Sequence, residues 1–255
     1  AVEPRLTATV WQRSDRQVEI ALETGKCVGQ VTPAGVKWSE IPSRDFHFVA
    51  RAIDFVLRLA GKEGPGFTMA FLPSPQPNGL KLGLGSSAQA TVLAAELCRF
   101  AVGTSVDILK VALAAHLSAQ DGRGSGADVA CCFAGGLIRY RRFAAEEVVK
   151  ASVDGGLRGA LASAAPIDLL REKQSALPML FAFSGAAAST PHLVAAAQQQ
   201  LGQSVRQRFV AESDEWGMVL QSSAQRGDFD GVRRACQALQ ERLSHLGASR
   251  SDSID

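Results

Sequence analysis

Apolar and polar residues alternate over much of the first third of the chain and recur at helical spacing in most of the remainder. Alternating or β-branched positions predict strands in four segments, with turn-forming residues between the first three. These segments are 6–11, 18–22, 27–31 and 67–71. The short connections favour an antiparallel meander for the first three strands, which the run from Pro33 to Gly35 breaks. A helix is predicted at 46–60, with Ser43 as its N-cap.

The second half of the chain is richer in helix patterns than in strand patterns. Helical spacing or helix-forming composition predicts several helices after the glycines that follow residue 80. The predicted helices are 88–100, 107–119 with Asp107 as N-cap, one starting behind Thr190 and Pro191, one around 209–220 and one around 232–246. Strands are predicted at 136–141 and 178–183, whereas 147–165 has little pattern. Mixed strands and helices followed by helices predict an α+β fold.

Length and composition restrict the class of protein. At 255 residues, with 46% hydrophobic and 20% charged residues, the chain can form one large domain or two closely packed ones. A net charge of +2 favours neither nucleic-acid nor membrane binding, and the apolar runs are too short to span a bilayer. The five cysteines lack metal-ligand spacing, so we expect reduced thiols in a cytoplasmic protein. The chain starts with Ala1 and ends in a polar tail, and we expect either a complete polypeptide or a fragment.

The stretch Leu80–Ala90 reads Leu-Lys-Leu-Gly-Leu-Gly-Ser-Ser-Ala-Gln-Ala and joins a strand pattern to a helix pattern. A helix start presents unpaired N–H groups and the positive end of the helix dipole, which favour an anion such as phosphate. Gly83 and Gly85 allow the backbone to approach that anion closely. Ser86 and Ser87 can cap the helix, bind phosphate or ligate Mg²⁺. The residues therefore favour a nucleotide phosphate loop.

Other interpretations of this stretch remain open at this point. A strand–turn–helix junction with a serine cap and no ligand needs the same residue types. The G-x-x-x-x-G-K-[ST] loop does not fit, because no Gly-Lys-Ser/Thr follows. The spacing of Gly83, Gly85 and Ala88 does satisfy the loose dinucleotide-binding fingerprint, with Asp107 downstream. However, Asp107 precedes a helix pattern, where an N-cap is expected rather than a ribose-binding acid at the end of a strand.

Three glycine and hydroxyl turns, at 81–88, 124–128 and 184–190, together resemble the GHMP small-molecule kinases, the family of galactose, homoserine, mevalonate and phosphomevalonate kinases. Residues 83–88 match that family's G-L-G-S-S-A loop in every letter, and 125–128 resemble its S-G-x-D segment. The closest likeness is to the phosphomevalonate kinase branch, over about residues 79–193. The family's first motif, P-G-K, and its late G-x-G-G-G motif have no counterpart in these residues.

The resemblance implies a two-lobed α+β fold. Its N-terminal, nucleotide-binding lobe is expected at 1–165, like domain 2 of ribosomal protein S5, and an incomplete, helix-rich α/β acceptor-binding lobe at 166–255. ATP and Mg²⁺ are the implied cofactors. The expected catalytic residues are Asp128, as the base for the acceptor hydroxyl, and Lys81, which would stabilise charge on the transferred phosphoryl group. The expected phosphate-binding residues are Gly83, Leu84, Gly85, Ser86, Ser87 and Ala88, with Ser87 as the Mg²⁺ ligand.

The acceptor-binding residues implied by the resemblance are Ser125, Gly126, Arg139, Ser184, Gly185, Ser189 and Thr190. Arg139 can pair with an acceptor carboxylate or phosphate, or stay solvated. Several family members place a glutamate on the helix before S-G-x-D, whereas residues 113–120 contain no acid. Their polar members include His116, which we interpret as an ordinary helix residue.

The predicted function is ATP-dependent phosphorylation of a small acceptor, in first place phosphomevalonate to diphosphomevalonate in isoprenoid precursor synthesis. The alternatives are mevalonate kinase, diphosphomevalonate decarboxylase and a catalytically silent nucleotide-binding homologue. We expect a monomer or homodimer that binds a small-molecule acceptor, no nucleic acid and no membrane.

Overall fold

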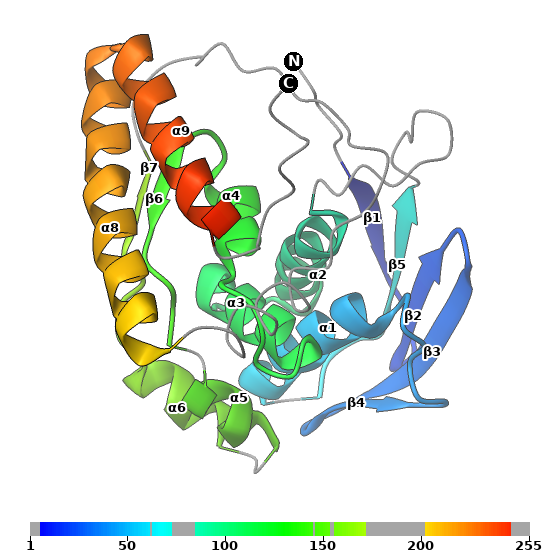
Figure 1. Cartoon of the computed structure of the whole chain (residues 1–255). Helices are drawn as coiled ribbons and strands as arrows, with labels where there is room; N and C mark the ends of the chain where they lie inside the picture. Colours follow the sequence, from blue (N-terminus) through cyan, green and yellow to red (C-terminus); the bar gives the residue numbers. More distant parts are fainter. Residues whose placement is uncertain are drawn as a thin grey trace. The chain divides into compact units, whose positions relative to one another are not determined.

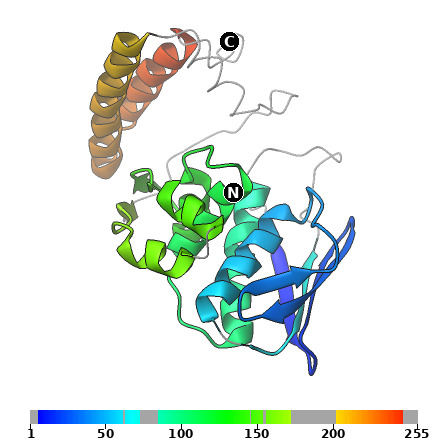
Figure 2. The same ribbon diagram turned by 90° about the horizontal axis from the view of Figure 1, so that it is seen from below.

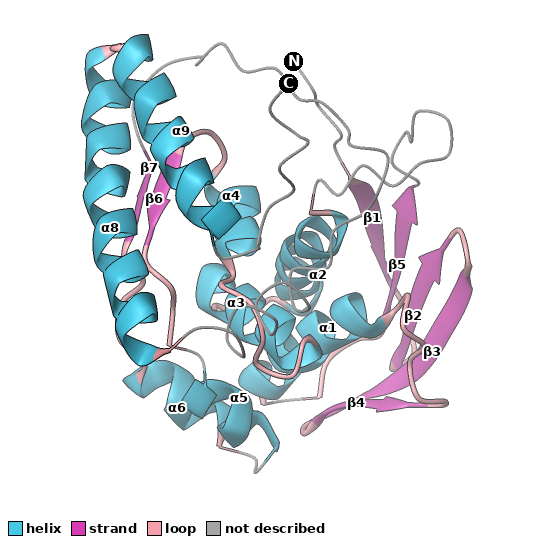
Figure 3. Cartoon of the chain, viewed as in Figure 1, coloured by secondary structure: helices cyan, strands magenta, loops and turns pink. Residues whose placement is uncertain are grey.

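The computed structural model describes residues 6–61, 63–72, 85–144, 146–153, 156–171 and 202–245. The chain forms two compact units, Ala1–Leu170 and Arg171–Asp255. The predicted lobe boundary between residues 165 and 166 falls in the connection between the last helix and the last strand of the first unit. Helices and strands both contribute to the first unit, and the α+β prediction is confirmed (Figure 3).

A five-stranded sheet with the order β1-β5-β2-β3-β4 forms one side of the first unit (Figure 1). Its strands are β1 (Thr7–Gln12), β2 (Gln17–Leu22), β3 (Gly25–Thr32), β4 (Gly35–Trp38) and β5 (Phe67–Leu72). β3 pairs antiparallel with β2 on one side and with β4 on the other. β5 pairs antiparallel with β1 and parallel with β2. In the register of the parallel pair, Val18 lies opposite Phe67 and Ile20 opposite Met69, and all four side chains are buried.

The predicted meander of the first three strands is therefore wrong at one pairing. β5 lies between β1 and β2, although it comes after the helix α1 in the chain. The residues from Pro33 to Gly35 do not end the sheet, because Pro33 and Ala34 form a tight turn that leads into β4. Short connections favour neighbouring strands, but the parallel β2–β5 pair shows that a later strand can take an inner position.

Helices α1 (His47–Ala60), α2 (Ser86–Val102) and α3 (Ile108–Ala119) pack together beside the sheet (Figures 1 and 2). α1 contacts β4, and α2 contacts β1 and β5, so these two helices cover one face. α3 packs against both helices. The sheet's buried side chains and the apolar faces of the three helices form one hydrophobic core. Ala88 at the start of α2, and Val129 and Ala130 at the start of α4 (Ala127–Ala134), belong to this core. The core thus holds the N-terminal ends of α2 and α4, which carry the predicted chemistry.

Asp107 is the N-cap of α3, as predicted: its side chain accepts a hydrogen bond from the backbone N–H of Lys110 at 3.1 Å. This role explains its position without a ribose-binding function. The predicted N-cap of α1 is wrong, since the helix begins after Phe46 and has no side-chain cap. Ser43 instead offers its backbone carbonyl to the N–H of Phe46, in the turn that precedes the helix.

The rest of the first unit is made of short elements. They are α4 (Ala127–Ala134), β6 (Ile138–Tyr140), α5 (Glu146–Val153), α6 (Leu157–Ser163) and β7 (Leu169–Arg171), with β6 and β7 paired as a small sheet. In the second unit, α8 (Gln203–Arg226) and α9 (Phe229–His245) pack against each other. The predicted strand at 178–183 and the helix behind Thr190 lie outside the described residues. No helix in the described part of the chain combines the length and apolarity needed to cross a membrane.

Candidate active site

The N-terminus of α2 carries the described end of the predicted phosphate loop. Gly85 is the N-cap residue, with a left-handed backbone (φ 73°), and it provides no side-chain cap. Ser86 and Ser87 are the first two helical residues, and Ala88 is buried beneath them. Neither serine caps this helix, so the serine cap of the ligand-free alternative is wrong. The helix dipole favours an anion at this end of α2, where Ser86 is exposed and Ser87 Oγ lies 3.3 Å from His116 Nε2.

The N-terminus of α4 carries the predicted catalytic aspartate. Gly126 is the N-cap residue (φ 76°), and Asp128 is the second residue of the helix. The Asp128 side chain is 45% exposed, and its Oδ1 accepts a hydrogen bond of 2.9 Å from the N–H of Val129. The second carboxylate oxygen, Oδ2, points toward α3. An exposed carboxylate fixed at a helix start can meet a substrate hydroxyl.

These two helix starts, about forty residues apart in the sequence, lie side by side. A Cβ atom placed on Gly85 would lie 3.9 Å from the Cβ of Asp128 and 4.0 Å from that of Ala88. α2 and α4 also pack against each other. The structure thus brings the end of the predicted phosphate loop into contact with the predicted base.

His116 links the two helix starts from beneath. Its Nε2 lies 3.3 Å from Ser87 Oγ and 3.9 Å from Asp128 Oδ2. The imidazole is 1% exposed, and its ring packs on that of Phe48 with centroids 4.9 Å apart. Burial lowers the pKa of His116, and the charge of Asp128 opposes this shift.

Sequence patterns alone did not single out His116, which was expected to be an ordinary helix residue. A signal was present, because α3 is otherwise rich in alanine and leucine and nearly all of it is buried. A polar side chain on the buried face of such a helix needs a partner, and that need could have singled it out.

A small network holds the turn that precedes α4. Tyr140 donates its hydroxyl hydrogen to the carbonyl of Ser125 at 3.1 Å and accepts a hydrogen bond from the N–H of Phe143 at 2.9 Å. The hydroxyl of Ser125 accepts a hydrogen bond from the N–H of Ala127 at 3.2 Å. Arg139, on β6, is half exposed and pairs with Asp168 at 3.5 Å. The hydrogen bonds of Tyr140 and Ser125 thus fix the turn from which the helix of Asp128 starts.

The remaining predicted site residues lie outside the described part of the chain. They are Lys81, Gly83, Leu84, Ser184, Gly185, Ser189 and Thr190. Their roles stay predictions.

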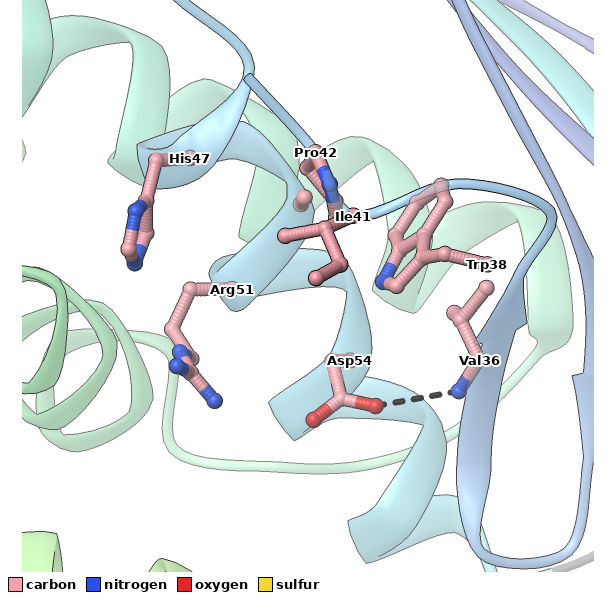
Figure 4. Close-up of a pocket in the computed structure, with 8 residues that line it drawn as sticks. Val36, Trp38, Ile41, Pro42, His47, Arg51 and Asp54 are labelled. Carbon is pink, nitrogen blue, oxygen red and sulfur yellow. Dashed lines mark hydrogen bonds between the residues drawn. The ribbon is translucent and has the colours of Figure 1, made fainter. Parts of the chain in front are cut away.

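A pocket of about 300 Å³ opens at the start of α1 (Figure 4). It is lined by Val36, Trp38, Ile41, Pro42, His47, Ala50, Arg51 and Asp54. Asp54 accepts a hydrogen bond of 3.0 Å from the N–H of Val36, and burial raises the pKa of its carboxyl group. The volume lies at the lower end of the range for small-ligand pockets. α1 contributes to both places, since His47 lines the pocket and the ring of Phe48, the next residue, packs on that of His116.

The donor set at the two helix starts fits magnesium. Ser87 and Asp128 offer oxygen atoms, which Mg²⁺ prefers. In the part of the chain that the structure describes, no three histidine, cysteine or acidic side chains form a metal-binding group. Such a site suits an ion that is held by one or two protein oxygens together with substrate phosphates and water.

Comparison with known proteins gives a consistent picture. Residues 47–136 match the family model described as the GHMP kinases N terminal domain, a range that runs from α1 past α4. The structure is similar to that of Streptococcus pneumoniae phosphomevalonate kinase in complex with phosphomevalonate and AMPPNP, with a TM-score of 0.74 and 20% sequence identity. The match covers 94% of this chain and 70% of that one.

A second structure of Streptococcus pneumoniae phosphomevalonate kinase matches with a TM-score of 0.69 and 20% identity, over 94% of this chain and 69% of that one. The predicted α+β fold of this kinase family is confirmed. Comparison with curated proteins finds no match.

Proposed function

The chain carries a GHMP kinase N-terminal domain, and on this premise we propose that it transfers the γ-phosphoryl group of ATP to a small acceptor, in first place phosphomevalonate. The observation that carries the proposal is the contact between the start of α2, with Gly85, and the start of α4, with Asp128. One helix start suits a phosphate group and the other presents a carboxylate. Phosphoryl transfer requires such an arrangement, since it depends mainly on positioning and charge stabilisation.

Each described residue has a definite task in this proposal. The N–H groups at the start of α2 and the hydroxyl of Ser86 bind phosphate oxygens, aided by the positive end of the helix dipole. Asp128 accepts or orients the proton of the attacking acceptor hydroxyl. Ser87 and Asp128 would hold Mg²⁺, which would supply positive charge to offset that of the nucleotide phosphates. Lys81 is proposed to stabilise the transferred group.

The pocket at the start of α1 is proposed to take the base of the nucleotide. Its walls combine an indole ring, aliphatic side chains and three polar groups, a composition suited to a flat heterocycle with polar edges. Trp38 and Ile41 provide apolar surface, and His47 and Arg51 provide donors (Figure 4). Support comes from α1, whose His47 lines the pocket and whose Phe48 packs on His116, and from the packing of α1 against α2.

The acceptor is proposed to lie beside Asp128. The residues proposed to contact it are Ser125, Gly126 and Arg139, which lie in the described part of the chain, and Ser184, Gly185, Ser189 and Thr190, which the resemblance implies. Support for phosphomevalonate comes from the structurally similar Streptococcus pneumoniae enzyme, whose structure was determined with that compound and AMPPNP.

Coupled ADP-release assays with mevalonate, phosphomevalonate, homoserine and galactose test the proposal. We expect turnover with phosphomevalonate first. Measurement of CO₂ with diphosphomevalonate as an additional substrate separates a kinase from a diphosphomevalonate decarboxylase. Absence of turnover with all four acceptors would refute the kinase assignment.

Asp128→Asn tests the assigned base, with Asp121→Asn as the matched control, because Asp121 is a nearby exposed carboxylate on the preceding turn. Asparagine tolerates the positive φ of 54° at position 121. We expect Asp128→Asn to lower kcat by about 10²- to 10⁴-fold while the affinity for AMPPNP stays nearly unchanged. Unchanged turnover in Asp128→Asn would show that another group acts as the base.

A further inference from the structure

His116 occupies an unusual position for an ionisable side chain. Among the described residues, the buried polar side chains are Thr91, His116, Ser152 and Ser223, and His116 alone of these can carry a charge. It contacts groups from three other helices: Ser87 on α2, Asp128 on α4 and Phe48 on α1. Buried polar groups are costly unless they are paired, so an imidazole at this point needs a reason.

The two ring nitrogens have different surroundings. Nδ1 is buried and has no hydrogen-bond partner in the described part of the chain, whereas Nε2 faces Ser87 Oγ and Asp128 Oδ2. A proton on Nδ1 would leave a buried donor unpaired and would turn the lone pair of Nε2 toward a carboxylate oxygen. A proton on Nε2 instead has Ser87 Oγ as a hydrogen-bond acceptor at 3.3 Å and a negatively charged oxygen, Asp128 Oδ2, at 3.9 Å. We therefore assign the Nε2–H tautomer.

This tautomer determines what the hydroxyl of Ser87 can do. Ser87 Oγ uses one lone pair to accept from Nε2–H, so its own hydrogen must point elsewhere and its second lone pair stays free. Ser87 lies in the first turn of α2, where neither serine serves as the helix cap. The free lone pair can ligate a cation, and the hydroxyl hydrogen can go to a phosphate oxygen. Asp128 Oδ2 lies 3.9 Å from Nε2, too far for a hydrogen bond, so the N–H dipole attracts that carboxylate electrostatically.

We propose that His116 is a positioning residue: its Nε2–H fixes the Ser87 hydroxyl and the Asp128 carboxylate relative to each other, so that the phosphate side and the acceptor side of the site keep one geometry. The proposal rests on the phosphoryl-transfer function proposed above. His116 lies beneath the two groups and makes no contact with substrate in this role. Groups that orient a ligand or base from behind affect activity by about 10- to 100-fold.

Three substitutions separate positioning from packing. His116→Gln can place an amide N–H where Nε2 lies, His116→Asn has an amide that reaches only as far as Nδ1, and His116→Leu keeps apolar volume without a donor. We expect kcat to fall by about 10- to 100-fold in the leucine and asparagine variants and to be largely retained in the glutamine variant. The affinity for AMPPNP and the KM for the acceptor should change little in all three.

The Ser87→Ala background tests whether His116 acts through its neighbour. Residues that work through one contact are non-additive, so His116→Leu should lower kcat much less in Ser87→Ala protein than in the wild type. Melting temperatures are measured alongside. The proposal is overturned if the glutamine variant is as impaired as the asparagine variant, or if kcat follows the melting temperature across the series. It is also overturned if His116→Leu lowers kcat by the same factor in the Ser87→Ala background as in the wild type.

A spectroscopic readout is independent of turnover. Long-range proton–nitrogen correlation spectra of histidine-labelled full-length protein identify the protonated ring nitrogen, and His116→Gln identifies the signals of His116 by their loss. We expect a neutral ring with the proton on Nε2 and a clear change of its signals in Ser87→Ala. A proton on Nδ1 would overturn the positioning proposal, whereas an inactive wild type with the expected tautomer would count against the kinase function alone.

Discussion

Replacing Gly126 by alanine perturbs the turn before α4 in two separable ways. The backbone there has φ 76°, and a left-handed conformation costs an alanine roughly 1–2 kcal/mol. The new Cβ would also lie 2.6 Å from Cδ2 of Leu113 and 3.3 Å from the hydroxyl of Tyr140. Leu113 is fully buried in the core, so its displacement adds about 1–3 kcal/mol of overpacking. The expected total loss of unfolding free energy is about 2–5 kcal/mol.

Gly122 is the matched control for this change. It has the same φ of 76°, but a Cβ there would meet nothing within 4 Å. The backbone cost and the loss of chain entropy in the unfolded state are shared by both alanine variants and cancel in their difference. Urea unfolding followed by circular dichroism should therefore show Gly126→Ala to be less stable than Gly122→Ala by about 1–3 kcal/mol. Equal stabilities would refute the assigned clash with Leu113. Kinase activity should also be lower in Gly126→Ala than in Gly122→Ala, since Asp128 lies two residues after Gly126.

Three further predictions concern single side chains. The Arg13 guanidinium, with a backbone N–H, holds the pKa of Asp15 at about 2, so its stabilisation is present at neutral pH and is lost as pH falls below about 4. Asp15→Asn should therefore lower the urea midpoint at pH 7, and the gap to wild type should narrow toward pH 3; a constant gap would contradict this. Asp107→Ala should cost about 0.5–2 kcal/mol in urea unfolding, and Asp107→Asn should recover most of that loss, because asparagine also caps helices. Iodoacetamide should label exposed Cys131 well before Cys132, whose pKa is raised to about 11 mainly by burial; mass spectrometry of partly labelled protein would reveal the opposite order.

Local signals in the sequence predicted local structure well. Asp107 could be identified as an N-cap because the residues that it caps follow it directly. The turns at 83–88 and 125–128 could be identified as chemical motifs for the same reason, since each needs only its own letters. The α+β class followed from the order of strand and helix patterns.

The features that were missed depend on distant partners. β5 lies between β1 and β2 because of strand pairs such as Val10 with Met69, whose members are about sixty residues apart. A local sequence pattern cannot predict a pair at that separation. His116 gains its role from Ser87 and Asp128, which lie on two other helices. The pocket at the start of α1 draws its walls from β4, the next connection and the helix, so it exists only after they pack.

The place of β1 in the sheet has a consequence for how the protein is made. β1 is an edge strand, and within the described sheet its one neighbour is β5, from Thr7 with Leu72 to Gln12 with Phe67. During synthesis at about 5–20 residues per second, β1 waits roughly 3–12 s for its partner. β2, β3 and β4 meet through short turns and can pair long before that. Pulsed hydrogen exchange during refolding should find the β1 amides protected after those of β2 and β3. Until then β1 is unpaired and β2 is an open edge of the partial sheet, and both are exposed to chaperones, proteases and other nascent chains.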